Sequence, residues 1–97
     1  MSDFCSRRKG DINELKATIW LLEQGYEVYP NAGATGITDL VCEDKEGILY
    51  KVQVKTLQKL NGSYCFRCPK HQEYYKRGIK LLWVYEDQVG WNRDYFV

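Results

Sequence analysis

Apolar and polar residues alternate along residues 48–56, which read I-L-Y-K-V-Q-V-K-T. Successive side chains of a strand point to opposite faces, so this alternation predicts a strand with one apolar and one polar face. The apolar set is Tyr50, Val52 and Val54, and the polar set is Lys51, Gln53 and Lys55. Because the strand is rich in β-branched residues and enclosed by other apolar segments, we expect a central position, with an aqueous cleft along the polar face.

An apolar stripe at three- and four-residue spacing predicts an amphipathic helix over residues 11–24. The stripe consists of Ile12, Leu15, Ile19 and Leu22. Gly25 follows, at a position where a left-handed residue commonly ends a helix. Asp11 and Glu14 have the spacing of a capping box, but Glu14 also lies beside the stripe, where it could serve an active site. The spacing leaves both roles of Glu14 open.

The other segments predict short elements. Strands are expected over residues 26–30, 37–44, 64–68, 80–86 and 89–97, and a short helix from Pro69 to near Gly78. A turn at residues 44–47 should join the second and third strands as an antiparallel hairpin. Residues 31–36 read as a small-residue loop, residues 57–63 as a polar connection and residues 1–9 as a solvated tail. The order is α-β-β-β-(β)-α-β-β.

Length and composition favour a soluble globular protein. A chain of 97 residues allows one modest core, so we expect a single domain over residues 1–97. The net charge of +1 neither demands nor excludes a nucleic-acid partner. The chain has neither an apolar run of about 18 residues nor a signal peptide, so we expect no membrane span and a cytoplasmic location, in a bacterial or phage-infected cell.

Four cysteines are present, at positions 5, 42, 65 and 68. Without a secretory signal we expect reduced thiols. Cys65, Cys68 and His71 have the spacing C-x2-C-x2-H, which would suit zinc in a small regulatory protein. A structural zinc site needs four ligands, however, so two cysteines preceding a helix remain the favoured interpretation.

The polar face of the strand at residues 48–56 carries candidate chemistry. Asp39 lies on the preceding strand, and its carboxylate could meet the amide oxygen of Gln53 and the ammonium of Lys55 in the cleft. These groups are the parts needed for metal-assisted phosphodiester hydrolysis.

The chain resembles the PD-(D/E)xK nuclease superfamily. The matching residues are Glu14 on a helix, Gly36-x-x-Asp39 on a strand and Gln53-x-Lys55 on the next strand. The resemblance implies an α/β (α+β) restriction-endonuclease-like core, with a mixed central sheet flanked by helices. The nearest branches are the Holliday-junction-resolvase-like nucleases and the resolvase-like homing endonuclease of a group I intron, which also has Gln-x-Lys.

This resemblance implies a role for each catalytic residue. Mg²⁺, with Mn²⁺ as a substitute, would be held by Asp39, the Gln53 amide oxygen and the Val54 carbonyl. Glu14 would hold a water ligand or a second ion, and Lys55 would orient the attacking water and oppose charge on the phosphate. Gln53 removes one negative charge from the usual ligand set, so either Glu14 compensates or the site is degenerate.

Two functions therefore stand together. The first is a metal-dependent DNA endonuclease, expected to be a homodimer or homotetramer because cutting both strands needs two sites. The second is a catalytically weak or inactive DNA-binding or interaction module on the same scaffold. The expected DNA contacts are Arg7, Arg8, Lys9, Thr56, Lys70, Lys76 and Arg77. Tyr74 and Tyr75 could stack on bases, but we expect both to pack inward.

Overall fold

The computed structural model describes residues 2–30, 40–66, 70–92 and 96, and the side chains from residue 8 onward. Helix α1 (Ser2–Glu23) leads into β1 (Glu27–Pro30), β2 (Leu40–Glu43) and β3 (Leu49–Thr56). A hairpin of β4 (Gln58–Leu60) and β5 (Ser63–Cys65) follows, and then α2 (His71–Lys76), β6 (Ile79–Tyr85) and β7 (Gln88–Gly90) complete the order. This succession agrees with the predicted one, apart from an additional strand before α2. No helix within the described ranges is long and apolar enough to cross a membrane.

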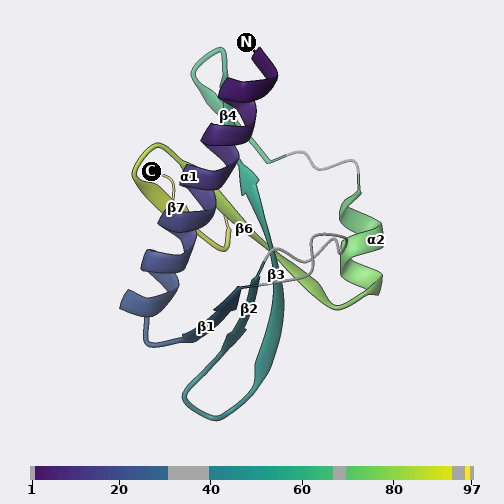
Figure 1. Cartoon of the computed structure of the whole chain (residues 1–97). Helices are drawn as coiled ribbons and strands as arrows, with labels where there is room; N and C mark the ends of the chain where they lie inside the picture. Colours follow the sequence, from purple (N-terminus) through teal and green to yellow (C-terminus); the bar gives the residue numbers. More distant parts are fainter. Residues whose placement is uncertain (1, 31–39, 67–69, 93–95, 97) are drawn as a thin grey trace.

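The main sheet has five strands in the described part, in the order β1-β2-β3-β6-β7. Strands β3 and β6 pair in parallel, and the other neighbours are antiparallel, so the sheet is mixed. The predicted hairpin is confirmed, with Leu40 opposite Val52 and Cys42 opposite Tyr50. Figure 1 shows β3 as the long strand through the middle of the molecule, with α1 and α2 set apart from each other. The expected central position of β3 is therefore correct.

The core lies between α1 and one face of this sheet. Its fully buried members include Ala17 and Leu21 from α1, Leu40 and Cys42 from β2, Val52 from β3, and Leu82 and Val84 from β6. Tyr50 and Val54 pack against this cluster, which confirms the apolar face of β3. Burial raises the pKa of the Cys42 thiol, because the thiolate would lose its hydration. On the opposite face, the β4–β5 hairpin contributes to a second cluster around Leu57, Trp83 and Phe96.

Helix α1 begins earlier than predicted. It starts at Ser2 and passes through Gly10 and Asp11, so the capping box is wrong. Residues 2–9 are helical and not a tail, and Arg8 and Lys9 are solvated as expected. Residues 2–9 contain no proline or β-branched residue, and the helix absorbs Gly10 at a cost of about 1 kcal/mol. The predicted end is correct. Gly25 is left-handed, with φ 96°, and the N–H groups of Gly25 and Tyr26 close a Schellman motif on Leu22 and Leu21.

The apolar stripe of α1 faces solvent. The exposed fractions are 44% for Ile12, 64% for Leu15, 58% for Ile19 and 54% for Leu22. Asn13, Ala17 and Leu21 instead face the sheet, at four-residue spacing, and each is at most 5% exposed. The small Ala17 lets the helix approach the strands closely. Helix α1 therefore has two apolar faces, of which the described domain covers one.

Residues 57–63 are not the simple connection expected from sequence. Strand β4 pairs antiparallel with β5 around Asn61-Gly62, whose φ angles of 50° and 82° match a type I′ hairpin turn. All three residues of β4 are exposed, so the segment has no alternation of burial that would predict a strand. The strand expected over residues 64–68 is β5, which ends at Cys65. The last expected strand, 89–97, is β7 and ends at Gly90.

The turn between β2 and β3 is fixed by Asp44. Its carboxylate accepts hydrogen bonds from the N–H groups of Ile48 (3.0 Å) and Glu46 (2.9 Å) and from the Tyr50 hydroxyl (2.9 Å). The Ile48 N–H is the main cause of a lowered pKa for Asp44, because hydrogen bonds to a carboxylate stabilise its charged form. These bonds set the register in which β2 meets the polar residues of β3.

The core-facing side of α1 can be tested by truncation. Leu21→Ala should lower the free energy of unfolding by about 2–5 kcal/mol, because Leu21 is fully buried. Leu49→Ala, at a position that is 62% exposed, should change it by less than about 0.5 kcal/mol. Urea unfolding followed by circular dichroism measures both. Equal losses in the two variants would contradict the described packing.

Candidate active site

Gln53 and Lys55 lie on the face of β3 opposite Val52, as the alternation predicts. Both residues are half-buried. Gln53 Oε1 is buried and has no hydrogen-bond partner among the described residues. A buried amide oxygen without a partner costs free energy, and such groups are rare in folded proteins. Gln53 Oε1 is therefore suited to accept a ligand.

The Lys55 ammonium is held above α2. Its Nζ lies 5.3 Å from the centroid of the Tyr74 ring, within the range of a cation–π contact. Tyr74 is 4% exposed and packs inward as expected, whereas Tyr75 is 77% exposed, so the expectation for Tyr75 is wrong. Helical spacing places these neighbouring tyrosines on different sides of α2. Tyr74 thus positions the lysine over the polar face of the sheet.

Asp39, the predicted principal ligand, lies outside the described residues, as do residues 31–36. The described part of β2 begins at Leu40. Leu40 is opposite Val52, the residue immediately before Gln53. The start of β2 therefore lies beside Val52 and Gln53 of β3.

Glu14 lies on α1, on the other side of the sheet from Gln53. It is half-buried and lines a cleft of about 450 Å³. The described residues that line this cleft are Asp11, Glu14, Leu15, Thr18, Leu22, Val28, Pro30 and Leu40. Gln53 and Lys55 are not among them, since their side chains point to the other face of the sheet. Glu14 and Gln53 thus lie on opposite faces of the sheet, and the cleft that contains Glu14 extends to Leu40 at the start of β2.

A partly buried hydrogen bond connects α1 to the end of β3. Asn13 Nδ2 donates to Thr56 Oγ1 at 2.7 Å, and Asn13 is 5% exposed. Asn13 precedes Glu14 and Thr56 follows Lys55, so this contact fixes the distance between the two backbone segments that carry them. The sequence analysis did not identify Asn13, because a lone asparagine on a helix gives no pattern. The nearness of Asn13 to Glu14 in the sequence was the one available signal.

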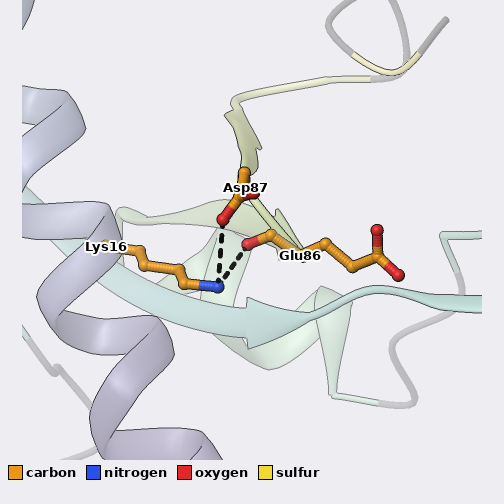
Figure 2. A network of polar contacts seen from close by, with 3 residues as sticks. All are labelled: Lys16, Glu86 and Asp87. Carbon is orange, nitrogen blue, oxygen red and sulfur yellow. Dashed lines mark hydrogen bonds and ion pairs between the residues drawn. The ribbon is translucent and has the colours of Figure 1, made fainter.

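Lys16 provides a second attachment of α1 to the sheet. Its Nζ donates to the Glu86 carbonyl at 2.7 Å and lies 3.6 Å from Asp87 Oδ1 (Figure 2). Glu86 and Asp87 form the turn between β6 and β7. The two attachments join α1 to different elements, since Asn13 reaches the end of β3 and Lys16 reaches the turn between β6 and β7. Together they limit rotation of the helix about its axis.

The predicted DNA contacts fall into two groups. Arg8, Lys9 and Thr56 line one groove of about 530 Å³, together with Lys16, which the sequence analysis did not identify. Lys70, Lys76 and Arg77 line another groove of about 450 Å³ on α2, where Arg77 pairs with Glu73 at 3.5 Å. The side chain of Arg7 lies outside the described part. The end of β3 connects the two groups, because Thr56 lines the first and Lys55 contacts α2.

The zinc motif is only partly described. Cys65 is half-buried at the end of β5, and His71 is exposed at the start of α2. Cys68 lies outside the described residues. Within the described ranges, no three His, Cys, Asp or Glu side chains are grouped so that they could hold a metal ion.

Comparison with known proteins points to one family. The model of the PD-(D/E)XK endonuclease family matches residues 4–90. Among solved structures, the chain is similar to the bacterial homing endonuclease I-Ssp6803I, with a TM-score of 0.66 and 28% sequence identity. That match covers 88% of this chain and 64% of the other, so this chain spans less than two thirds of that protein. No curated protein matches the chain.

The Asn13–Thr56 contact predicts a stability difference. Thr56→Val should lower the free energy of unfolding by about 1–3 kcal/mol, because the buried Asn13 amide would lose its acceptor. Thr56→Ser keeps the acceptor and should lose less than about 1 kcal/mol. Chemical denaturation of both variants measures the difference. A valine variant as stable as the serine variant would mean that the hydrogen bond contributes little.

Proposed function

The chain belongs to the PD-(D/E)XK endonuclease family, and we propose that it is a metal-dependent endonuclease that hydrolyses phosphodiester bonds in DNA. The observation that carries this proposal is the pair of Gln53 and Lys55 on the polar face of the central strand, with Gln53 Oε1 buried and without a partner. Similarity to a homing endonuclease supports DNA as the substrate. A homing-endonuclease-like or Holliday-junction-resolvase-like target fits this family.

The donor set fits a hard divalent cation. We assign the ligands as Asp39, Gln53 Oε1 and the Val54 carbonyl, with Glu14 at a water ligand or a second ion. Carboxylate, amide and carbonyl oxygens are preferred by Mg²⁺, and Mn²⁺ accepts the same ligands. The unsatisfied Gln53 oxygen supports this assignment, because a cation would supply the missing partner. When bound, the ion would offset negative charge on the phosphate and make water a better nucleophile.

Lys55 would act directly on the substrate. Its ammonium can donate a hydrogen bond that orients the attacking water, and its charge opposes the charge that develops on the phosphate. A positioned group of this kind is commonly worth about 3 kcal/mol of transition-state stabilisation. Contact with Tyr74 reduces the freedom of the lysine before substrate arrives, so less ordering is required on binding.

Glu14 would compensate for the missing charge at Gln53. An amide ligand keeps the oxygen but lacks the negative charge of a carboxylate, which weakens attraction for a cation. The extent of the Glu14 cleft supports this role, because the cleft reaches Leu40, the residue bonded to Asp39. The Asn13–Thr56 hydrogen bond would hold Glu14 in place relative to Lys55.

The DNA backbone would lie across the end of β3. Arg8, Lys9 and Thr56 on one side and the cations of α2 on the other could contact successive phosphates. Arg7, on the same helix as Arg8, completes the proposed set. We further propose that two or four copies assemble and that they act in the cytoplasm of a bacterial or phage-infected cell, where the DNA is accessible and cysteines stay reduced.

The second candidate function is DNA binding with weak or no cleavage, on the same scaffold. One observation favours it, namely the neutral amide of Gln53 at a position where a charged ligand would bind metal more strongly. The two functions share the DNA surface and differ in the metal-dependent chemistry.

Loss of the catalytic groups should abolish cleavage. Asp39→Ala and Lys55→Ala should each reduce the cleavage rate by at least about 100-fold without unfolding the chain. Lys51→Ala, on the same face of β3 but exposed, is the matched control and should remain active. The assay follows supercoiled plasmid and a synthetic four-way junction, with Mg²⁺, Mn²⁺ or EDTA. Wild-type activity in either of the first two variants would reject the assigned site, whereas DNA binding without metal-dependent cleavage would favour the second candidate function.

Restoring a carboxylate should strengthen metal binding. Gln53→Glu should lower the Mn²⁺ dissociation constant by about tenfold or more, because ligand charge governs affinity for divalent cations. Lys51→Glu places a carboxylate on the same strand face outside the assigned ligand set and should change the constant less. Isothermal titration calorimetry provides the measurement. Equal effects of the two glutamates would show that Gln53 is not a ligand.

A further inference from the structure

Helix α1 displays an apolar surface that the described domain does not cover. We call Ile12, Leu15, Ile19 and Leu22 the α1 seam, and each of these residues is 44% exposed or more. Their spacing is three, four and three residues, which places them in one continuous line along the helix. Four large apolar side chains aligned in this way differ from the scattered surface residues that need no explanation.

The seam has the sequence pattern of a two-stranded coiled coil. In heptad terms, Ile12 and Ile19 occupy position a, and Leu15 and Leu22 occupy position d. Among parallel coiled coils, isoleucine at a with leucine at d favours two strands over three or four. The residue at f, Ala17, is fully buried against the sheet, so the seam points away from the domain core. Helix α1 can therefore pack on its own sheet and on a second helix at the same time.

We propose that α1 pairs in parallel with α1 of a second copy of this chain, through the α1 seam. Charges beside the seam agree with this partner. Asp11 at position g is exposed. The Lys16 side chain at position e is 33% exposed, and its ammonium donates one of its three N–H groups to the Glu86 carbonyl of its own chain and lies 3.6 Å from Asp87, which leaves a donor for a partner helix. In a parallel pair, the g residue of one helix faces the following e residue of the other, so Asp11 of each copy would meet Lys16 of the other with opposite charge.

Such a pair would bring two sites to one symmetry axis. Leu15 and Leu22 of the seam line the Glu14 cleft, and Ile12 lines the groove that contains Arg8 and Lys9. Parallel helices are related by a two-fold axis along their length, so both copies present the same end of the molecule to one DNA duplex. This consequence rests on the proposed function, whereas the pairing itself does not.

Molar mass in solution tests the pairing. Light scattering after size exclusion, on the full chain at roughly 1–100 μM so that a micromolar dissociation constant is detectable, should show a dimer or a multiple of it. Ile19→Glu should raise the dissociation constant by at least about 100-fold, because association would bury an unpaired carboxylate. Leu60→Glu is the matched control, since Leu60 is 57% exposed and Ile19 58%, and its assembly should equal that of the wild type. Circular dichroism confirms that both variants are folded.

A cysteine cross-link tests the orientation. Ile19 would face its own counterpart in a parallel pair, so Ile19→Cys should form a covalent dimer on mild oxidation, above the background of wild type and of Leu60→Cys. A monomeric wild type, an unchanged Ile19→Glu assembly or the absence of this cross-link would overturn the proposal. Cleavage is scored separately. A dimer without nuclease activity would reject the proposed function alone, and a cleaving monomer would reject the pairing alone.

Discussion

The alternation of side chains along β3 is the constraint on which the rest of the molecule depends. As the central strand, β3 must present Val52 to the core under α1 and, one residue later, Gln53 to the other face. A polar face on a central strand is stable only if its groups find partners or reach solvent. The Lys55 ammonium contacts the Tyr74 ring, whereas Gln53 Oε1 has no hydrogen-bond partner among the described residues. The strand thus lies at the centre of the sheet and also carries the polar face of the candidate site.

Attachment of α1 is the second requirement, because this helix carries Glu14 while β3 carries Lys55. Apolar packing of Ala17 and Leu21 resists separation of the helix from the sheet, but it resists sliding and rotation only weakly. The hydrogen bonds of Asn13 and Lys16 resist sliding and rotation more strongly, since a hydrogen bond restricts both distance and angle. Two polar side chains in the middle of α1 therefore fix the helix relative to β3, although neither is a proposed catalytic residue.

Much of the fold could be predicted from sequence, because the spacing of apolar residues indicates which side chains are buried when an element has one buried and one polar face. The two faces of β3, the hairpin with β2 and the helix end at Gly25 followed from alternation and turn chemistry. The orientation of α1 could not be predicted, since spacing reveals an apolar stripe but not which surface covers it, and Ala17 adds little to any pattern. Strand β4 was missed because no residue in it is buried. For the candidate site, the strand face of Gln53 and Lys55 was predictable from alternation, whereas Asn13 and Lys16 act through contacts with residues distant in sequence.

The edges of the sheet have a consequence for colloidal behaviour. Strand β1 is four residues long and ends in Pro30, and β7 has three residues. Short edges, and a proline that lacks a donor, are poor templates for adding a strand from another molecule. Open-ended β-aggregation is therefore disfavoured even at high protein concentration. The proposed pairing of α1 would have the same effect, because a helix face that is covered by one partner offers no surface for adding a third copy.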